Sequence, residues 1–314
     1  MYQPKEGSMK KLIFATITSL IFMSVSFAEE EGCLSTTDIS VKEAQERLAP
    51  ILGRAKVVSI SEAPIEDFYE VIVELRGRKI PVYVDCDFKY LISGEIIDIQ
   101  KKESLTRKKM LELSKEAVKE KVKQLEAIIG KDKAQKLKEK AGIAFMQKAK
   151  IVNIKGMPKE NLVLGNPNAK IKLYIIEDPE CPACAVYHDN VEEVLKDRKD
   201  ISFGVILFPL PFHKHAKKVS YNIICQSDMK KKQEILKKSF EYVKERKSSK
   251  LKQLEKDCKK AEPIIDKNLE FFGKKTPIGG TPTTVFPLKE GKALMISGVL
   301  DKETIEDVVD TLYK

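Results

Sequence analysis

The chain has 314 residues, of which 42% are hydrophobic and 33% are charged, and its formal net charge is +10. This composition is that of a globular protein, it excludes a mainly disordered chain, and the length predicts two domains. The positive residues alternate with glutamates along helical stretches such as 115–123, so they do not predict a nucleic-acid-binding surface.

The first 28 residues have the features of a secretory signal. Two lysines precede an apolar run that is short for a membrane helix and ends at Ala28 in a small-x-small pattern. Residues 1–8 would be an upstream extension before Met9. No lipobox precedes Cys33, so a lipoprotein is not expected. Export would place the chain in an oxidising compartment, where its six cysteines can form disulfides.

Residues 29–101 predict a small α+β domain. A capping-box pattern at 40–43 begins a short helix that ends near residue 52. Strand-forming runs follow at 56–61, 68–75, 79–84, 89–93 and 95–99. The expected unit is one helix on an antiparallel sheet, whose edge strands are either blunted by charge or paired with a second copy of the chain.

Residues 102–155 predict a helical linker. Apolar residues between 110 and 129 recur at three- and four-residue spacing among lysines and glutamates, and Gly130 separates this helix from a second one over 133–149. We expect a connector that packs partly on a domain, and a free stalk is the alternative.

Residues 156–314 contain the motif Glu177-Asp-Pro-Glu-Cys181-Pro-Ala-Cys184, between a strand-forming run and an amphipathic helix. Cys181 falls on the first helical turn, where unpaired N–H groups and the helix dipole stabilise an anion, so we expect a thiolate at neutral pH. Cys184 is placed to resolve a mixed disulfide at Cys181. Half of a zinc site is the alternative, but no second ligand pair accompanies the motif. The pattern therefore favours redox chemistry without a metal or other cofactor.

The rest of this region predicts an α/β domain around the cysteine pair. Strands at 170–176 and 201–208 would flank the motif helix as a βαβ unit. Residues 162–168 are expected to form a turn-rich segment that leads into this unit. Further elements are helices within 215–272, a strand after Gly279-Gly-Thr-Pro282, a strand at 293–299 and a closing helix at 302–312. A proline at the start of a strand is unfavourable for ordinary pairing.

The order of these motifs resembles the thioredoxin fold and the DsbC/DsbG family of periplasmic disulfide isomerases. Residues 82–94 (VYVDCDFKYLISG) are similar to the family's dimerisation-domain signature, and Asp178-Pro-Glu-Cys-Pro-Ala-Cys184 is similar to the DsbG version of the active site. The resemblance covers nearly all of the exported chain. It implies an α+β, cystatin-like N-terminal dimerisation domain, a helical linker and a C-terminal α/β thioredoxin-like domain with a helical insertion.

In this family the proline matching Pro282 is cis and faces the cysteine pair, and the backbone of the preceding residue pairs with a bound peptide. Thr281 matches the residue that DsbC and DsbG carry there, whereas DsbA oxidases usually carry valine. The resemblance therefore favours an isomerase or reductase over an oxidase. A trans proline that begins a strand is the alternative.

Two further residues are candidates for tuning the pair. His188 lies one turn after Cys184 on the same helix face, and a structural hydrogen-bonding role is its alternative. Ile175 stands where thioredoxin has a buried carboxylate. Proton transfer at Cys184 would therefore use water or a nearby group such as Glu177.

The remaining four cysteines allow three connectivities. Proximity along the chain favours Cys225–Cys258 in the inserted helices and Cys33–Cys86 in the first domain. The former resembles the structural disulfide of the family's catalytic domain. The latter has no family counterpart, and an intermolecular bond or a free thiol stays open there.

The sequence thus predicts a homodimeric, periplasmic isomerase or reductase that acts on misoxidised exported proteins. The resemblance implies a membrane electron donor of the DsbD type. A reductase of single oxidised cysteines and a chaperone or holdase are the alternatives. No nucleic-acid partner is expected.

Overall fold

The computed structural model describes Cys33 and residues 39–75 and 78–314. The predicted secretory signal lies outside these described residues. The chain divides into two compact units, of which the first ends at Thr106 and the second runs from Arg107 to Lys314. Among the described residues, no helix is both long and apolar enough to cross a membrane.

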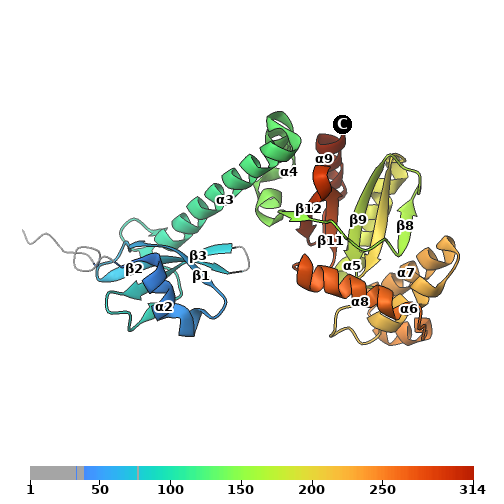
Figure 1. The fold of residues 1–314 in the computed structure, drawn as a ribbon, viewed down its shortest axis with the longest axis horizontal. Coiled ribbons are helices and arrows are strands. Elements are labelled where there is room, and N and C mark those ends of the chain that lie inside the picture. Colours follow the sequence, from blue (N-terminus) through green and yellow to red (C-terminus); the bar gives the residue numbers. More distant parts are fainter. Residues whose placement is uncertain (1–32, 34–38, 76–77) are drawn as a thin grey trace, which may run out of the picture. The chain divides into compact units, whose positions relative to one another are not determined.

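The first unit is one helix on an antiparallel sheet (Figure 1). Its sheet has the order β1-β2-β3-β4. These elements are α2 (Val41–Leu52), β1 (Lys56–Glu62), β2 (Phe68–Leu75), β3 (Arg78–Asp85) and β4 (Leu91–Ile92). Ser40 caps α2 by accepting the N–H of Glu43 at 3.2 Å, as the capping-box pattern predicts. Ala44 and Leu48 of α2 belong to the core beneath the helix, together with valines of β2 and β3.

The strands after β3 are shorter than the sequence predicts. β4 has two residues, and so does β5 (Ile97–Asp98), which pairs with β6 (Glu103–Ser104) in a separate two-stranded sheet. Residues 86–88 form a turn, and Lys89 and Tyr90, at the start of the strand predicted at 89–93, lie outside any strand. The Asp85 carboxylate accepts the N–H of Tyr90 at 2.6 Å. The side-chain hydrogen bond competes there with strand pairing.

The helical connector folds as α3 (Leu105–Ile129) and α4 (Lys131–Lys148), which are separated at Gly130 as predicted. Gly130 has a φ of 87°, a conformation that favours glycine. Buried apolar residues of the two helices join the core of the second unit: Val118, Val122, Leu125, Ala134, Leu137, Phe145 and Met146. This part of the connector therefore packs on a domain and is not a free stalk.

The second unit is built on a six-stranded sheet in the order β7-β12-β11-β9-β10-β8. Its strands are β7 (Lys150–Asn153), β8 (Leu162–Gly165), β9 (Ile171–Glu177), β10 (Ile201–Leu207), β11 (Thr283–Pro287) and β12 (Lys292–Ser297). β9 and β10 are parallel and are joined by α5 (Pro182–Asp197), which is the predicted βαβ unit. The expected lead at 162–168 is instead partly an edge strand, because β8 pairs with β10.

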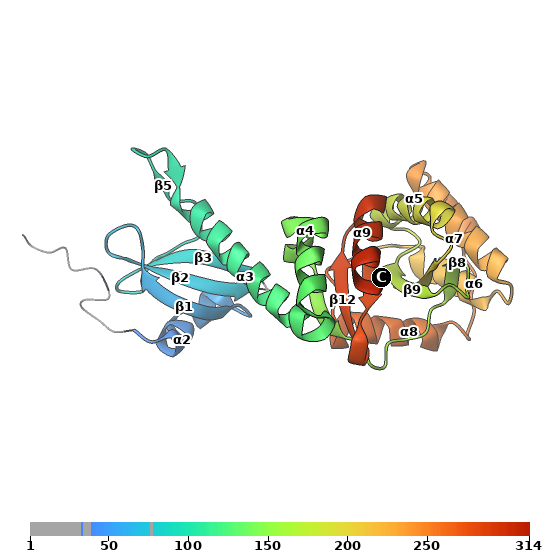
Figure 2. The same ribbon diagram turned by 90° about the horizontal axis from the view of Figure 1, so that it is seen from above.

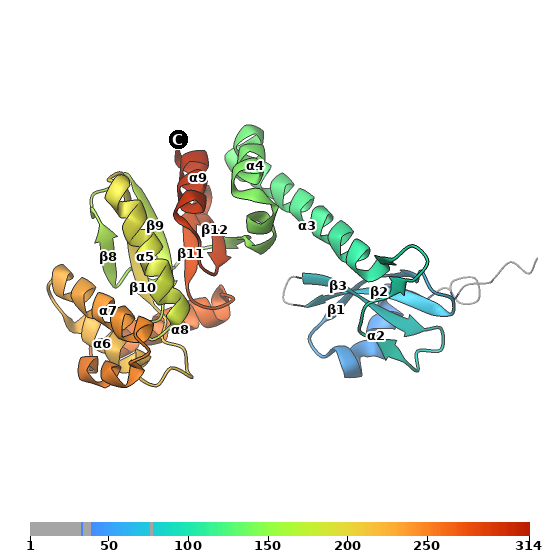
Figure 3. The same cartoon turned by 180° about the vertical axis from the view of Figure 1, so that it is seen from behind.

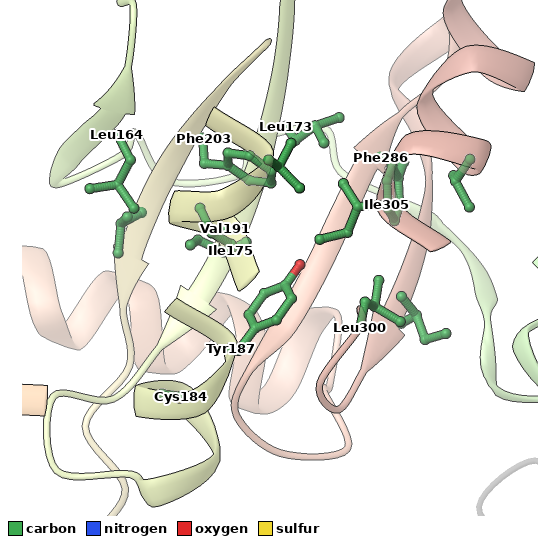
Figure 4. Packing of buried hydrophobic residues seen from close by; sticks show 14 of the residues in the cluster. Leu164, Leu173, Ile175, Cys184, Tyr187, Val191, Phe203, Phe286, Leu300 and Ile305 are labelled. Carbon is green, nitrogen blue, oxygen red and sulfur yellow. The ribbon is translucent and has the colours of Figure 1, made fainter. Parts of the chain in front are cut away.

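Helices cover both faces of this sheet (Figures 2 and 3). α5 and α9 (Lys302–Tyr313) lie on one face, and α8 (Glu262–Glu270) lies with the π-helical turn η2 (Phe271–Lys275) on the other. The side chains of β9 alternate between these two cores, as the two-residue period of a strand requires. Figure 4 shows the first core, to which Tyr187 of α5 belongs together with Val191, Phe203 and Phe286. The Tyr187 hydroxyl lies 2.6 Å from Thr284 Oγ1 of β11.

The helical insertion consists of several pieces. They are α6 (Ala216–Cys225), α7 (Met229–Lys244), the 3-10 helix η1 (Ser248–Leu254) and α8. The Cys225–Cys258 disulfide joins the end of α6 to the segment before α8. In the first unit, the Cys33–Cys86 disulfide joins the beginning of the described chain to the turn after β3. The structure thus contains both pairings that proximity favoured.

Candidate active site

The cysteine pair lies where β9 ends and α5 begins. Cys181 is the N-cap residue of α5, with an extended backbone, and Pro182 is the first helical residue, a position where proline fits because its missing N–H would have no helical partner. The N–H of Ala185 donates to the Cys181 carbonyl at 3.1 Å and closes the first turn. Cys181 is 6% exposed and Cys184 is fully buried. Both are thiols.

The two thiols have opposite electrostatic environments. The hydrogen bond from Cys184 is the main cause that lowers the pKa of Cys181 to about 6, and the Thr281 side chain and the N–H groups of the helix start act in the same direction against the effect of burial. Burial raises the pKa of Cys184 well above its usual value, and the hydrogen bond to Cys181 and the charge of Glu177 add to the effect. The pair is therefore an acidic outer thiol and a protonated inner thiol, as the helix position predicts.

A loop with a cis Thr281–Pro282 bond faces Cys181. The Cys181 thiol donates to the Thr281 carbonyl oxygen at 3.5 Å. Hydroxyl groups hold this loop from behind, because Thr283 Oγ1 donates to the Gly280 carbonyl at 2.5 Å and lies 2.7 Å from Ser297 Oγ. The structure thus brings the predicted substrate-binding residues to the predicted nucleophile, although they are 100 residues apart in the chain.

Asp178 organises the turn that leads to Cys181. Its buried carboxylate accepts from the N–H of Glu180 at 2.7 Å, from the N–H of Leu210 at 2.6 Å and from His213 Nδ1 at 2.8 Å. The hydrogen bond to Asp178 raises the pKa of His213, so the imidazole gains positive charge beside the cysteine pair. The loop between β10 and α6 is thereby fixed next to the active-site turn.

Glu180 makes a second connection to the insertion. Its Oε2 accepts the N–H groups of His215 at 2.6 Å and Ala216 at 3.0 Å, at the beginning of α6. The N–H groups of a first helical turn have no helical acceptor, so the carboxylate caps the helix. The sequence alone does not indicate these roles. The acidic residues lie inside the quoted motif, but nothing local connects them with residues some 35 positions later.

The two predicted tuning residues meet behind the pair. Glu177 is fully buried, His188 is 4% exposed, and Glu177 Oε2 lies 3.8 Å from His188 Nδ1. The imidazole packs on the Phe240 ring, with the centroids 5.0 Å apart. Among the described residues, no group of three or more His, Cys, Asp or Glu side chains is arranged to hold a metal ion.

Two family models match the sequence. Residues 157–313 match the thioredoxin-like domain, and residues 35–107 match the N-terminal domain of disulfide bond isomerase proteins. A comparison with curated proteins found no match.

Similar solved structures have low scores. They include Pseudomonas aeruginosa DsbA2 (21% identity, 49% of this chain and 95% of that chain, TM-score 0.41). They also include alpha-DsbA1 of Wolbachia pipientis (16% identity, 52% and 96%, TM-score 0.42). A third is ScsC of Proteus mirabilis in a transitional conformation (22% identity, 48% and 72%, TM-score 0.39).

Proposed function

Because the chain belongs to the thioredoxin-like family and carries the N-terminal domain of disulfide bond isomerases, we propose that it reshuffles or reduces incorrect disulfides in exported proteins. It is a thiol–disulfide oxidoreductase of the Dsb type.

The observation that carries the proposal is the inequality of the two thiols. With a pKa of about 6, Cys181 is roughly 90% thiolate at pH 7. Burial raises the pKa of Cys184, so this thiol is protonated at the same pH. The Cys181 thiolate attacks one sulfur of a substrate disulfide, forms a mixed disulfide and releases the other sulfur as a thiolate. The substrate is thereby held covalently through the sulfur of Cys181.

The mixed disulfide can be resolved by two different reactions, which correspond to the two proposed activities. A second thiol of the substrate can attack the substrate sulfur and expel Cys181, which rearranges the disulfide without net electron transfer. Alternatively Cys184 attacks Cys181 Sγ, so that the Cys181–Cys184 disulfide forms and the substrate leaves as a reduced thiol. Isomerase activity follows from the first reaction and reductase activity from the second.

Substrate binding is proposed at the Thr281 loop. Its carbonyl oxygen lies beside Cys181 Sγ, where an extended peptide can add backbone hydrogen bonds in the manner of an extra strand. Phe212, in the loop that Asp178 fixes, is 75% exposed and offers an apolar contact for an unfolded chain. Threonine before the proline supports isomerase or reductase chemistry over oxidase chemistry through the family resemblance.

Assembly and compartment are part of the same proposal. The match of residues 35–107 to the isomerase N-terminal domain supports a homodimer that forms through this domain. Export to the periplasm would follow from the signal pattern in residues 1–28, and the reduced state would be maintained by a membrane donor of the DsbD type. Two catalytic units in one dimer can engage one misfolded substrate at two places.

The test is refolding of a scrambled multi-disulfide protein, compared with oxidation of the same protein in its reduced form. With reduced glutathione present, we expect the chain to recover native activity from the scrambled substrate faster than it oxidises the reduced one. Cys184→Ser should keep part of this activity, because substrate thiols can still expel Cys181. Rapid oxidation without unscrambling would instead identify an oxidase.

A second candidate is reduction of single oxidised cysteines, which the DsbG-like motif Asp178-Pro-Glu-Cys-Pro-Ala-Cys184 favours. A protein carrying one sulfenic acid separates the two, because it offers no second thiol to an isomerase. A chaperone or holdase is the non-enzymatic alternative. Refolding assistance that survives in a variant with both active cysteines changed to serine would support the holdase.

A further inference from the structure

A surface hollow of about 440 Å³ lies in the second unit, between the edge strand β7 and the π-helical turn η2. This volume is within the range of small-ligand pockets, which is roughly 300–1,000 Å³. The described residues of the active site do not line the hollow, and β12 and β11 separate β7 from β9 in the sheet. A molecule bound in the hollow would therefore not contact the cysteine pair, and its binding is independent of the proposed function.

The π-helical turn forms one side of the hollow and is fastened to the strand on the other side. The Thr276 N–H donates to the Phe271 carbonyl at 2.7 Å, across five residues. Thr276 is 9% exposed, and its hydroxyl donates to the Asn153 carbonyl of β7 at 3.2 Å. π-Helical turns are rare and often occur at functional sites. Since Thr276 already covers part of the strand edge, the hollow suits a compact ligand better than a peptide that adds as a further strand.

Three lysines give the hollow a positive charge. They are Lys150 on β7, Lys155 just after this strand and Lys275 in η2, and all three are exposed. Lys275 pairs with Glu270 at 3.1 Å, whereas Lys150 and Lys155 have no ion pair with any residue that the structure describes. Cations around a concave surface raise the local concentration of anions. The chain therefore leaves at least two ammonium groups at the hollow for an anion from outside.

The polar groups of the hollow are held in place by the backbone around them. The Lys155 N–H donates to Asn153 Oδ1 at 2.8 Å, which leaves the Asn153 amide group as a donor without a partner among the described residues. The Ile154 N–H donates to the Gly291 carbonyl at 2.8 Å. Gly291 has a φ of 73°, and a Cβ there would lie 2.7 Å from Lys155 Cγ. The missing side chain of Gly291 thus makes room for the stem of Lys155.

From this geometry we propose that the hollow binds a phosphate-bearing ligand. Two unpaired ammonium groups favour a dianion, and lysine binds phosphate as a point charge. The described lining contains no arginine, whose planar fork would select a carboxylate by shape. Val152 and Phe271 also line the hollow and offer an apolar wall for the carbon part of the ligand. A soluble phosphorylated molecule and a phospholipid headgroup share this chemistry.

The test is isothermal titration calorimetry of the full chain with pyrophosphate at constant ionic strength. We expect one pyrophosphate per chain with a dissociation constant below about 1 mM. Lys150→Gln combined with Lys155→Gln should weaken binding at least about tenfold, the effect of one lost hydrogen bond to a charged group. The matched control is Lys230→Gln combined with Lys231→Gln, which removes the same charge from exposed positions of α7 and should change the affinity less than about twofold.

Asn153→Asp is a second variant that keeps both lysines. Its carboxylate can still accept the Lys155 N–H, but it replaces a donor by a negative charge inside the hollow. Binding should weaken at least about threefold, which is the scale of one exposed charge interaction. Far-UV circular dichroism checks that the variants are folded. Insulin reduction by the same proteins tests the proposed function separately, and we expect wild-type rates because the substituted residues lie away from the cysteine pair.

Sedimentation with phosphatidylcholine vesicles, with and without phosphatidylglycerol, distinguishes the two sources of phosphate. Pyrophosphate binding without vesicle binding supports a soluble ligand. Vesicle binding that requires phosphatidylglycerol and is lost in the Lys150 and Lys155 double variant, but not in the α7 control, supports a lipid headgroup. If the wild-type chain binds neither probe, the proposal is wrong. It is also wrong if the two double variants lose binding equally, since this is the pattern of general attraction to a basic chain.

Discussion

Cys86 and Cys181 both lie just after a strand, but their environments differ. Cys86 directly follows β3, and Cys181 comes after the short turn at the end of β9. After β3 the chain makes a turn in which the Cys86 N–H donates to the Asp67 carbonyl at 3.1 Å, and the sulfur is in a disulfide with Cys33. After β9 the chain begins a helix, and its N–H groups point at the sulfur of Cys181. The segment after the strand therefore decides whether a cysteine is a cross-link or a nucleophile.

The largest effect should come from exchanging the sulfur at the helix start. Cys181→Ser should reduce insulin at the uncatalysed rate, because a serine hydroxyl at this place cannot exchange with a disulfide. Insulin turbidity with a thiol reductant measures the loss. Cys86→Ser is the comparison, and we expect it to keep the catalytic rate. A catalytic loss in Cys86→Ser of similar size would contradict the division of roles.

The second effect concerns stability in the first unit. The Cys33–Cys86 bond closes a loop with a sequence separation of 53, so changing both cysteines to serine should cost roughly 4 kcal/mol of unfolding free energy in the chain-entropy model. Urea unfolding followed by far-UV circular dichroism measures it. An unchanged midpoint of the first transition would show that the bond does not cross-link this unit.

The third effect is the pH dependence of the reactivity of Cys181, which should differ from that of an ordinary thiol. The lowered pKa means that the reactive thiolate of Cys181 is present above about pH 6 and is lost as the pH falls through this value. Alkylation of reduced protein by iodoacetamide should therefore have its midpoint near pH 6, with Cys181 labelled first by mass spectrometry. A midpoint near pH 8.5, the value of an ordinary thiol, or first labelling of Cys184, would overturn the assignment.

The smallest effect is expected at the loop that faces the nucleophile. The Thr281 side chain helps to lower the pKa of Cys181, so Thr281→Val should raise this pKa and make the pair more reducing. We expect the potential against glutathione to fall by about 10–30 mV, where 30 mV corresponds to about 1.4 kcal/mol for two electrons. Ser297→Ala is a control that alters the support of the loop but not the contact with Cys181. An unchanged potential in Thr281→Val would leave this threonine without a redox role.

Much of the fold was predictable because its signals depend on residues that are close together in the sequence. The capping pattern at Ser40, the glycine break at Gly130 and the strand–motif–helix order around Cys181 all depend on residues a few positions apart. The family resemblance supplied the rest of the architecture, including the cis proline. The edge strands β7 and β8 were missed, since an edge strand is defined by its partner and not by its own composition.

The site was only partly predictable for the same reason. The sequence identified Cys181 and Cys184 through helix position, and it named Glu177 and His188 separately. Their approach to 3.8 Å depends on how β9 and α5 pack, which no periodicity encodes. The hydrogen bond between Asp178 and His213 likewise joins the end of β9 to a loop 35 residues later.

The carboxylate of Glu180 has a mechanical consequence. One oxygen binds the first N–H groups of α6, so the turn that carries Cys181 and the disulfide-linked insertion are fastened to each other. A displacement of the turn when Cys181 becomes covalently loaded would weaken these two bonds. Hydrogen exchange of the His215 and Ala216 amides with heavy water should therefore report when the mixed disulfide at Cys181 forms and when it is resolved.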